Sequence, residues 1–172
     1  CKLQREVLQQ KRPAQANDAT PTAQPDGSLH IAPQDPVNTA RAFASRTYRR
    51  DGVPTLREWQ GQFYQWRGGA WVELAEPDVT TPLYGFIERH ATGFKAKRSI
   101  VSDAMHALRH LSTVHLESTI APPAWLDGAE GPPASELVAC TNGLLHLPTG
   151  ELKPATPNLF NLNALPVAFD PA

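Results

Sequence analysis

The side chains in this sequence that could do chemistry are mainly cations, and they gather at two places in the middle of the chain. Three fall within residues 95–98, and two adjacent arginines occupy positions 49–50. Clusters of lysine and arginine beside the start of a helix can bind the phosphates of a nucleic acid. A surface charged only for solubility explains the same cations, and composition alone favours that alternative. The candidate nucleic-acid-binding residues are Arg49, Arg50, Lys95, Lys97, Arg98 and Arg109.

A second group of reactive side chains falls on one expected helix. Asp103, His106 and His110 are spaced at i, i+3 and i+7, and His115 follows shortly after. Two histidines four residues apart can reach one metal ion, so a metal-dependent enzyme is one hypothesis for the chain. The general-base glutamate that hydrolytic zinc helices carry between their histidines is missing here. A solvated polar face explains the group better, because Asp103 near the helix start and His110 near its end suit the helix dipole. We therefore predict no metal site.

The sequence carries no known catalytic pattern. It has no GxxxxGK(S/T) phosphate loop, no paired acids of the kind that hold metal in primase active sites, and no GxSxG or HExxH. Cys1 and Cys140 belong to no CxxC or Cys/His cluster, which disfavours a zinc site or a disulfide framework. We assign no catalytic residue and no cofactor to this segment.

The net charge of −1 conceals a gradient along the chain. Residues 36–116 carry eleven Lys and Arg against seven Asp and Glu, a balance of +4, whereas residues 117–172 carry one against six, a balance of −5. A basic middle beside an acidic end indicates two different neighbours, a polyanion and a protein surface. An unevenly charged solvated surface explains the gradient equally well.

Composition divides the chain of 172 residues into a linker and one domain. Residues 1–34 are expected to form a helical and proline-rich linker segment, since most of them lack the large apolar side chains that would offset the entropy of ordering. Residues 35–172 are hydrophobic enough to form a core. No apolar run reaches the about 18 residues of a membrane span, so we expect no membrane contact. The two distant cysteines and the lack of a basic-then-apolar leader predict a cytoplasmic location. A chain that starts at Cys1 is expected to be part of a longer polypeptide.

The residue pattern of the domain predicts an α+β fold of about three helices and short antiparallel strands. Asp35 and Pro36 are expected to start a helix that stops at Gly52. Aromatic and β-branched residues between glycine turns over 55–74 predict a three-stranded meander. Its tryptophans are expected to be the core face of the sheet more often than a platform for bases.

Two further helices and C-terminal hairpins complete this expectation. One helix is expected over 78–90, with Pro82 near its first turn, and another over 99–111, capped by Ser99. Two hairpins follow, with turns at Asn142-Gly143 and Thr149-Gly150, and then an extended arm stiffened by prolines. Five apolar side chains are expected to pin this arm to the domain: Leu144, Leu147, Leu152, Phe160 and Leu165.

Residues 138–171 read VACTNGLLHLPTGELKPATPNLFNLNALPVAFDP. This stretch resembles the segment that precedes the superfamily 3 helicase motor in phage, plasmid and poxvirus DNA primase-helicases. Ala155 stands where many members of that family have histidine, so a role of that histidine does not transfer. The resemblance covers roughly residues 35–172. The motif residues that we expect to be architectural rather than catalytic are Asn142, Gly143, Thr149, Gly150, Pro157, Asn163 and Pro166.

The resemblance implies an accessory domain of a replicative primase-helicase from a bacterium, a phage or another mobile element. Such a domain would link the primase to the helicase, help a hexameric ring assemble and guide single-stranded DNA. Its partners would be single-stranded DNA, the primase and helicase domains of the same chain and further copies of the full-length protein. ATP and Mg²⁺ would belong to the motor. The rival hypothesis is a structural or protein-interaction module that makes no contact with nucleic acid.

Overall fold

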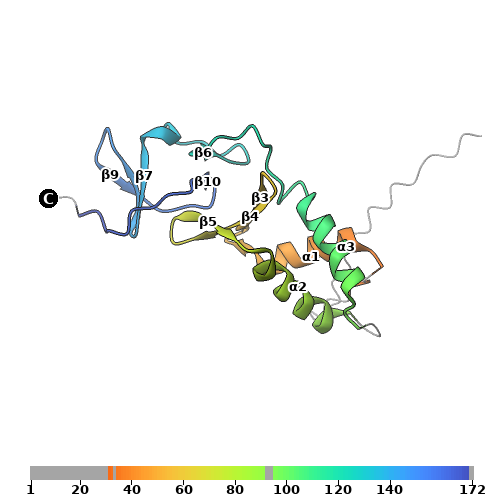
Figure 1. The fold of residues 1–172 in the computed structure, drawn as a ribbon. Coiled ribbons are helices and arrows are strands. Elements are labelled where there is room, and N and C mark those ends of the chain that lie inside the picture. The colour runs from red at the N-terminus through yellow and green to blue at the C-terminus, as the bar shows by residue number, and fades with distance from the viewer. Residues whose placement is uncertain (1–30, 33, 92–94, 171–172) are drawn as a thin grey trace, which may run out of the picture.

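The structure, a computed structural model, describes residues 31–32, 34–91 and 95–170. The helices lie at one end of the molecule, the C-terminal hairpins lie at the other, and a small sheet lies between them (Figure 1). Most of the segment expected to be a linker, including the helix expected over 1–12, lies outside the described residues. Ile31 lies upstream of the expected domain start, yet it is buried in the core and donates its backbone N–H to His90 O at 3.1 Å.

Helix α1 spans Pro36–Thr47 and begins where the sequence predicts, but the predicted stop at Gly52 is wrong, because the helix ends before Arg49 and Arg50, which form a short strand. Asp35 is its N-cap, and Asp35 Oδ1 accepts a hydrogen bond from the backbone N–H of Asn38 at 2.9 Å. Pro36 fills the first helical position, where a missing N–H costs nothing. The residue after the helix, Tyr48, is buried against its own helix and against Leu56 of the sheet.

Helices α2, Glu76–His90, and α3, Arg98–Arg109, differ from expectation at their starts. Helix α2 begins two residues earlier than predicted, because Pro77 in its first turn favours an earlier start. Pro82 therefore lies inside the helix rather than near its first turn. Helix α3 begins at Arg98 with Lys97 at the N-cap, so the prediction that Ser99 caps it is wrong.

The central sheet is the predicted meander of strands β3, Leu56–Trp59; β4, Gln62–Arg67; and β5, Ala70–Leu74. Gln60 and Gly61 turn between β3 and β4 with φ of 50° and 84°, a conformation that glycine adopts freely. The outer edge of β3 is covered by the chain around His115, which forms a parallel bridge with Glu58. A two-residue ribbon precedes the sheet, formed by β1, Arg49–Arg50, and β2, Val53–Pro54.

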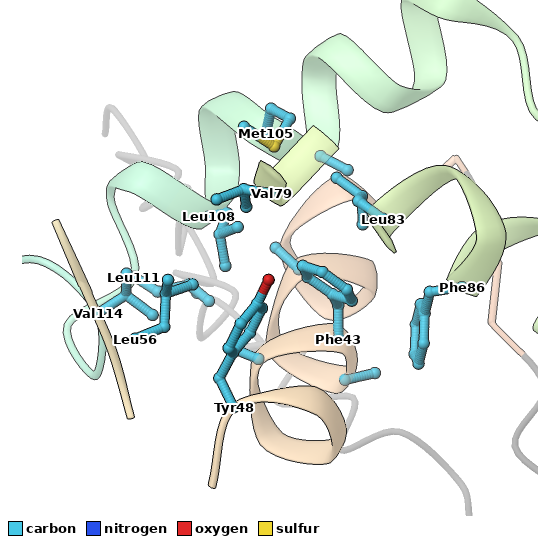
Figure 2. Packing of buried hydrophobic residues seen from close by; sticks show 14 of the residues in the cluster. Phe43, Tyr48, Leu56, Val79, Leu83, Phe86, Met105, Leu108, Leu111 and Val114 are labelled. Atoms are coloured by element: carbon cyan, nitrogen blue, oxygen red, sulfur yellow. The ribbon is translucent and has the colours of Figure 1, made fainter. Parts of the chain in front are cut away.

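The two faces of this sheet carry different cores. Leu56, Phe63 and Leu74 point to the helices and share one cluster with their apolar stripes. Figure 2 shows this cluster, in which Phe43 lies between Tyr48 and Phe86, each with a ring centroid 5.4 Å away. The opposite face is aromatic. Its side chains, including Trp66 and Trp71, pack against the C-terminal part of the chain, so the tryptophans form a core and not an open platform for bases.

The C-terminal part consists of short elements. They are β6, Ala124–Trp125; a 3₁₀ turn η1, Ala134–Glu136; β7, Leu137–Cys140; β8, Gly143–His146; β9, Glu151–Lys153; and β10, Leu159–Phe160. Strands β7, β8 and β9 form the two expected hairpins, and β10 pairs with β6. Cys140 pairs with Gly143, so the first turn consists of Thr141 and Asn142, one residue earlier than predicted.

After β10 the chain runs as the expected extended arm beside the free edge of β7. Leu165 N–H donates to Ala139 O at 2.8 Å, and Thr141 N–H donates to Val167 O at 3.0 Å. The prediction that Leu147 and Leu165 are buried and attach the arm to the domain is wrong, because Leu147 is 57% exposed and Leu165 is 50% exposed. Backbone hydrogen bonds hold this part of the arm instead. With three helices and several small antiparallel sheets in the described residues, the α+β prediction is confirmed.

Candidate nucleic-acid interface

Three cations in residues 95–98, which we call the basic link, lie at the start of α3. Lys95, Lys97 and Arg98 are all exposed. Lys97 is the N-cap, the first turn of α3 contains no acid, and no side chain of the described residues caps it. The first N–H groups of a helix have no partner within the helix and carry partial positive charge. Three side-chain cations and these backbone donors therefore face solvent at the same place, an arrangement that suits phosphate.

The two arginines at 49–50 form strand β1, directly after α1. Arg50 lies over the ring of Trp66, 5.1 Å from its centroid, and its Nε is 3.8 Å from Asp51 Oδ2. Arg49 is exposed and lines a hollow of about 340 Å³ together with Thr113 and other residues. Arg49 is therefore the more available of the two for a ligand.

Arg109 makes three contacts within the protein. Its Nη1 donates to Gly61 O at 2.9 Å, its Nη2 donates to Glu76 Oε2 at 3.0 Å, and its guanidinium lies 4.5 Å from the centroid of Phe63. These contacts join the end of α3 to the β3–β4 turn and to the start of α2. The guanidinium is thereby held in place by the fold, with its donors directed at protein acceptors.

The structure separates the predicted cations into two places. Lys95, Lys97 and Arg98 lie at the start of α3, whereas Arg49 lies beside Thr113, after the end of α3. A helix of 12 residues is about 18 Å long at 1.5 Å per residue. One phosphate cannot reach both places, so a shared ligand would have to be long.

The histidines expected on one helix face are neighbours in the structure. The ring centroids of His106 and His110 are 4.8 Å apart, and those of His110 and His115 are 6.4 Å apart. His115 Nδ1 lies 2.5 Å from Glu58 Oε2, which ties it to the sheet. In the part of the chain that the structure describes, no group of three or more His, Cys, Asp or Glu side chains is arranged to hold a metal ion.

Asn142, in the first motif turn, clamps the C-terminal arm. Its Nδ2 donates to Phe169 O at 2.8 Å, and its Oδ1 accepts from Phe169 N–H at 3.0 Å. Next to it, a methyl group on Gly143 would lie 2.4 Å from Lys153 O, because β9 passes closely over this position. Asn142 thus ties the arm to the first hairpin, and Gly143 lets β9 lie close to β8, roles beyond the turn that the sequence predicts.

The remaining motif residues also have architectural positions. Thr149 Oγ1 accepts from the backbone N–H of Glu151 at 3.3 Å, and Gly150 has a φ of 69° that glycine adopts without strain. Pro157 is buried in the turn before β10. Asn163 and Pro166 lie exposed on the arm, where the backbone carbonyl of Asn163 accepts from Asn161 Nδ2 at 2.8 Å.

Phe160 is the residue that anchors the motif to the aromatic face of the sheet. It is fully buried, and its ring centroid lies 5.5 Å from that of Trp59, 5.9 Å from that of Tyr64 and 5.8 Å from that of Trp71. On either side of it, Trp71 Nε1 donates to Leu159 O at 3.0 Å, and Trp71 N–H donates to Asn161 O at 2.8 Å.

Sequence reasoning missed an ion pair between a buried arginine of the central sheet and an aspartate just after β6. Arg57 is 1% exposed, its Nη1 donates to Thr113 O at 3.0 Å, and its Nη2 is paired with Asp127 Oδ2. A cation directly after Leu56 in the predicted meander was a signal that a partner was needed, because buried charges are almost always paired. The sequence could not name that partner, which lies 70 residues away.

Comparison with known families agrees with the resemblance of the motif. The family described as D5 N terminal like matches residues 40–172. The match covers more than three quarters of the chain, and the chain therefore belongs to this family, the domain N-terminal to the superfamily 3 helicase in primase-helicases. Among curated proteins, no sequence matches this chain. In the described residues, no helix is both long and apolar enough to span a membrane.

Proposed function

We propose that this domain contacts single-stranded DNA next to the helicase motor and links that motor to the primase. The family match over residues 40–172 carries the proposal, because it relates the chain to a domain adjacent to a DNA motor. The exposed cations at 95–98, beside the uncapped start of α3, supply the chemistry. They can bind the sugar–phosphate backbone without reading its sequence.

The charge gradient supports different binding partners for the two ends of the domain. Residues 36–116, with a balance of +4, would face the polyanion, and residues 117–172, with a balance of −5, would face protein. In the full-length protein we propose that the acidic end helps neighbouring copies assemble into a ring. ATP and Mg²⁺ would bind in the motor, and the whole protein would act in the cytoplasm of a bacterium, encoded by a phage or another mobile element.

Fluorescence anisotropy with a labelled oligo(dT) tests the DNA contact on the complete 172-residue chain. If about four phosphates are neutralised, log K falls against log salt with a slope near −3, from about 0.7 per contact. We expect weak binding that weakens steeply with salt. No detectable binding at about 50 mM salt, where phosphate contacts are strongest, would contradict the proposal.

Charge reversal separates the proposal from the structural alternative. Lys95→Glu, Lys97→Glu and Arg98→Glu together should abolish measurable affinity, because each carboxylate repels the phosphate that the cation attracted. A matched control reverses Arg46, Arg67 and Arg89, which are also exposed. If the domain is a structural module with a merely solvated basic face, the two triple variants will bind DNA equally.

A further inference from the structure

Two hollows are each lined both by residues of α1 and by residues of α3 or of the segment just after it. The first, of about 340 Å³, is lined by Arg41, Ser45 and Arg49 on one side and by Thr113 on the other. The second, of about 400 Å³, lies between Val37 and the face of α3 that carries its histidines. We define these two hollows together as the α1–α3 groove.

Three side chains of α1 and one residue after it form the α1 side of this groove. Val37, Arg41 and Ser45 are exposed and lie one above the other, because residues four apart on a helix share a face. Arg49, in β1 just after the helix, is also exposed and lines the same hollow as Arg41 and Ser45. The α1 side thus carries two exposed guanidinium groups and a hydroxyl.

A second stripe forms the α3 side. Ser99, Asp103, His106 and His110 lie on one face of α3 at helical spacing, and all four are exposed. The last three line the second hollow, and the rings of His106 and His110 are neighbours. Imidazole rings can stack on unpaired bases. The only carboxylate among the residues that line the two hollows is Asp103, which lines the second hollow with the histidines, whereas the two arginines line the first.

The floor of the first hollow is apolar and uncharged. Leu56 and Val114 are buried there, and so is Tyr48. Burial raises the pKa of the Tyr48 phenol, an effect that Arg67 opposes and Asp78 reinforces. The phenol therefore stays neutral at physiological pH and adds no negative charge beneath Arg41 and Arg49. An apolar floor under a cationic rim suits a nucleotide, whose base is apolar on its faces and whose phosphate is anionic.

We propose that the α1–α3 groove is the track for single-stranded DNA, an inference that rests on the proposed function and names its site. The track would start at the basic link 95–98, follow the histidine face of α3 and end at Arg41 and Arg49. It would join the two separated groups of cations with one ligand. Its section along α3, about 18 Å long, accommodates about five nucleotides at roughly 3.4 Å for each stacked nucleotide.

The test compares two double variants of the full chain in oligo(dT) anisotropy. Arg41→Gln with Arg49→Gln removes the groove cations, whereas Arg46→Gln with Arg89→Gln removes two exposed arginines that line neither hollow. We expect the groove variant to bind about tenfold more weakly or worse, with a salt slope shallower by about 1.4, the share of two phosphate contacts. The control should stay within about twofold of the parent chain. Equal thermal midpoints would show that the fold is intact.

Cross-linking gives a second readout that does not depend on substitutions. Oligo(dT) containing 4-thiothymidine should cross-link, on irradiation, to peptides that cover residues 36–49 and 103–114. Unchanged affinity of the groove variant, or cross-links confined to other segments, would overturn the groove while leaving the proposed DNA contact in place. A parent chain that binds no DNA at about 50 mM salt would overturn both.

Discussion

The two faces of the central sheet are covered in different ways. Three helices of 12 to 15 residues cover one face and bury a large hydrophobic core. Strands of two to four residues cover the other, held by Phe160 and by hydrogen bonds from single side chains such as Asn142. The helical side spreads its stability over many contacts, whereas the C-terminal side concentrates it in a few. Single substitutions should therefore weaken the C-terminal side selectively.

The proposed function divides along the same line. The motif that resembles the pre-helicase segment lies on the C-terminal side, where its residues form turns, clamps and an aromatic anchor. The exposed cations and the α1–α3 groove lie on the helical side. The motif thus holds the domain together, and the proposed DNA contacts lie outside it.

The largest expected effect comes from Phe160→Ala. The ring is fully buried among Trp59, Tyr64 and Trp71, and its loss should lower the free energy of unfolding by about 3–5 kcal/mol. Urea denaturation measures this, followed both by tryptophan emission and by helical circular dichroism. Phe160→Leu, which retains most of the volume, should cost clearly less. A loss below about 1 kcal/mol would contradict the view that this side depends on one anchor.

Asp127→Ala should have the next largest effect, because it removes the partner of the buried Arg57. A buried charge without its partner costs about 3–5 kcal/mol. Asp127 is itself half-exposed, so water can replace part of the interaction, and we expect a loss of about 2–3 kcal/mol. Asp127→Asn keeps an acceptor oxygen and should cost less. Replacing Arg57 by Met in the Asp127→Ala background should recover stability in urea denaturation, and failure to recover it would contradict this account.

The sequence predicted the fold where local signals decide the structure. Asp35 and Pro36 start α1 as expected, and glycine turns delimit the meander. The start of α2 was predicted too late, because proline is locally preferred in the first turn of a helix. In the structure Pro82 lies inside α2, since burial of Val79 and Leu83 in the core stabilises the helix despite the proline. The arm could not be predicted in detail, because the hydrogen bonds that hold Leu165 and Val167 join residues 26 apart.

The candidate site was also predictable only in part, because some of its contacts join residues that are far apart in the sequence. Exposure of Lys95, Lys97 and Arg98 follows from their charge. The partners of Arg109 lie 33 and 48 residues away, and no local pattern indicates them. The groove also depends on how α1 packs against α3, which brings Arg49 beside Thr113. The charged residues could be read from the sequence, but which of them lie along one groove depends on how the helices pack.

Gly143→Ala tests whether strand packing or turn geometry explains the motif glycines. The added methyl would lie 2.4 Å from Lys153 O, and relieving this clash requires the backbone of β9 to move. We therefore expect the free energy of unfolding to fall by about 2 kcal/mol. Gly150→Ala is the matched control, because its φ is 69° but the space around it is open. Only the backbone conformation is strained there, at a cost of about 1 kcal/mol. Equal losses in thermal or urea unfolding would show that turn conformation alone explains both positions.

The smallest expected effect on global stability comes from Asn142→Ala, and it sharpens the comparison most. Asn142 is exposed, so loss of its two hydrogen bonds to Phe169 should lower the free energy of unfolding by no more than about 1 kcal/mol. Locally, the Phe169 amide loses its acceptor. Its hydrogen exchange should accelerate about fivefold, while exchange at the core amides of α1 stays unchanged.

Asn163→Ala is the control for this clamp, since Asn163 is an exposed motif residue on the same arm. It should leave exchange at Phe169 unaltered. The Leu165 amide, which donates to Ala139 O, should stay protected in both variants, because that hydrogen bond does not involve either side chain. If Asn142→Ala instead accelerates exchange throughout β7 and β8, the residue acts as a turn former for the hairpin. If exchange changes only at Phe169 and its neighbours, the motif asparagine fixes the direction in which the chain leaves the domain.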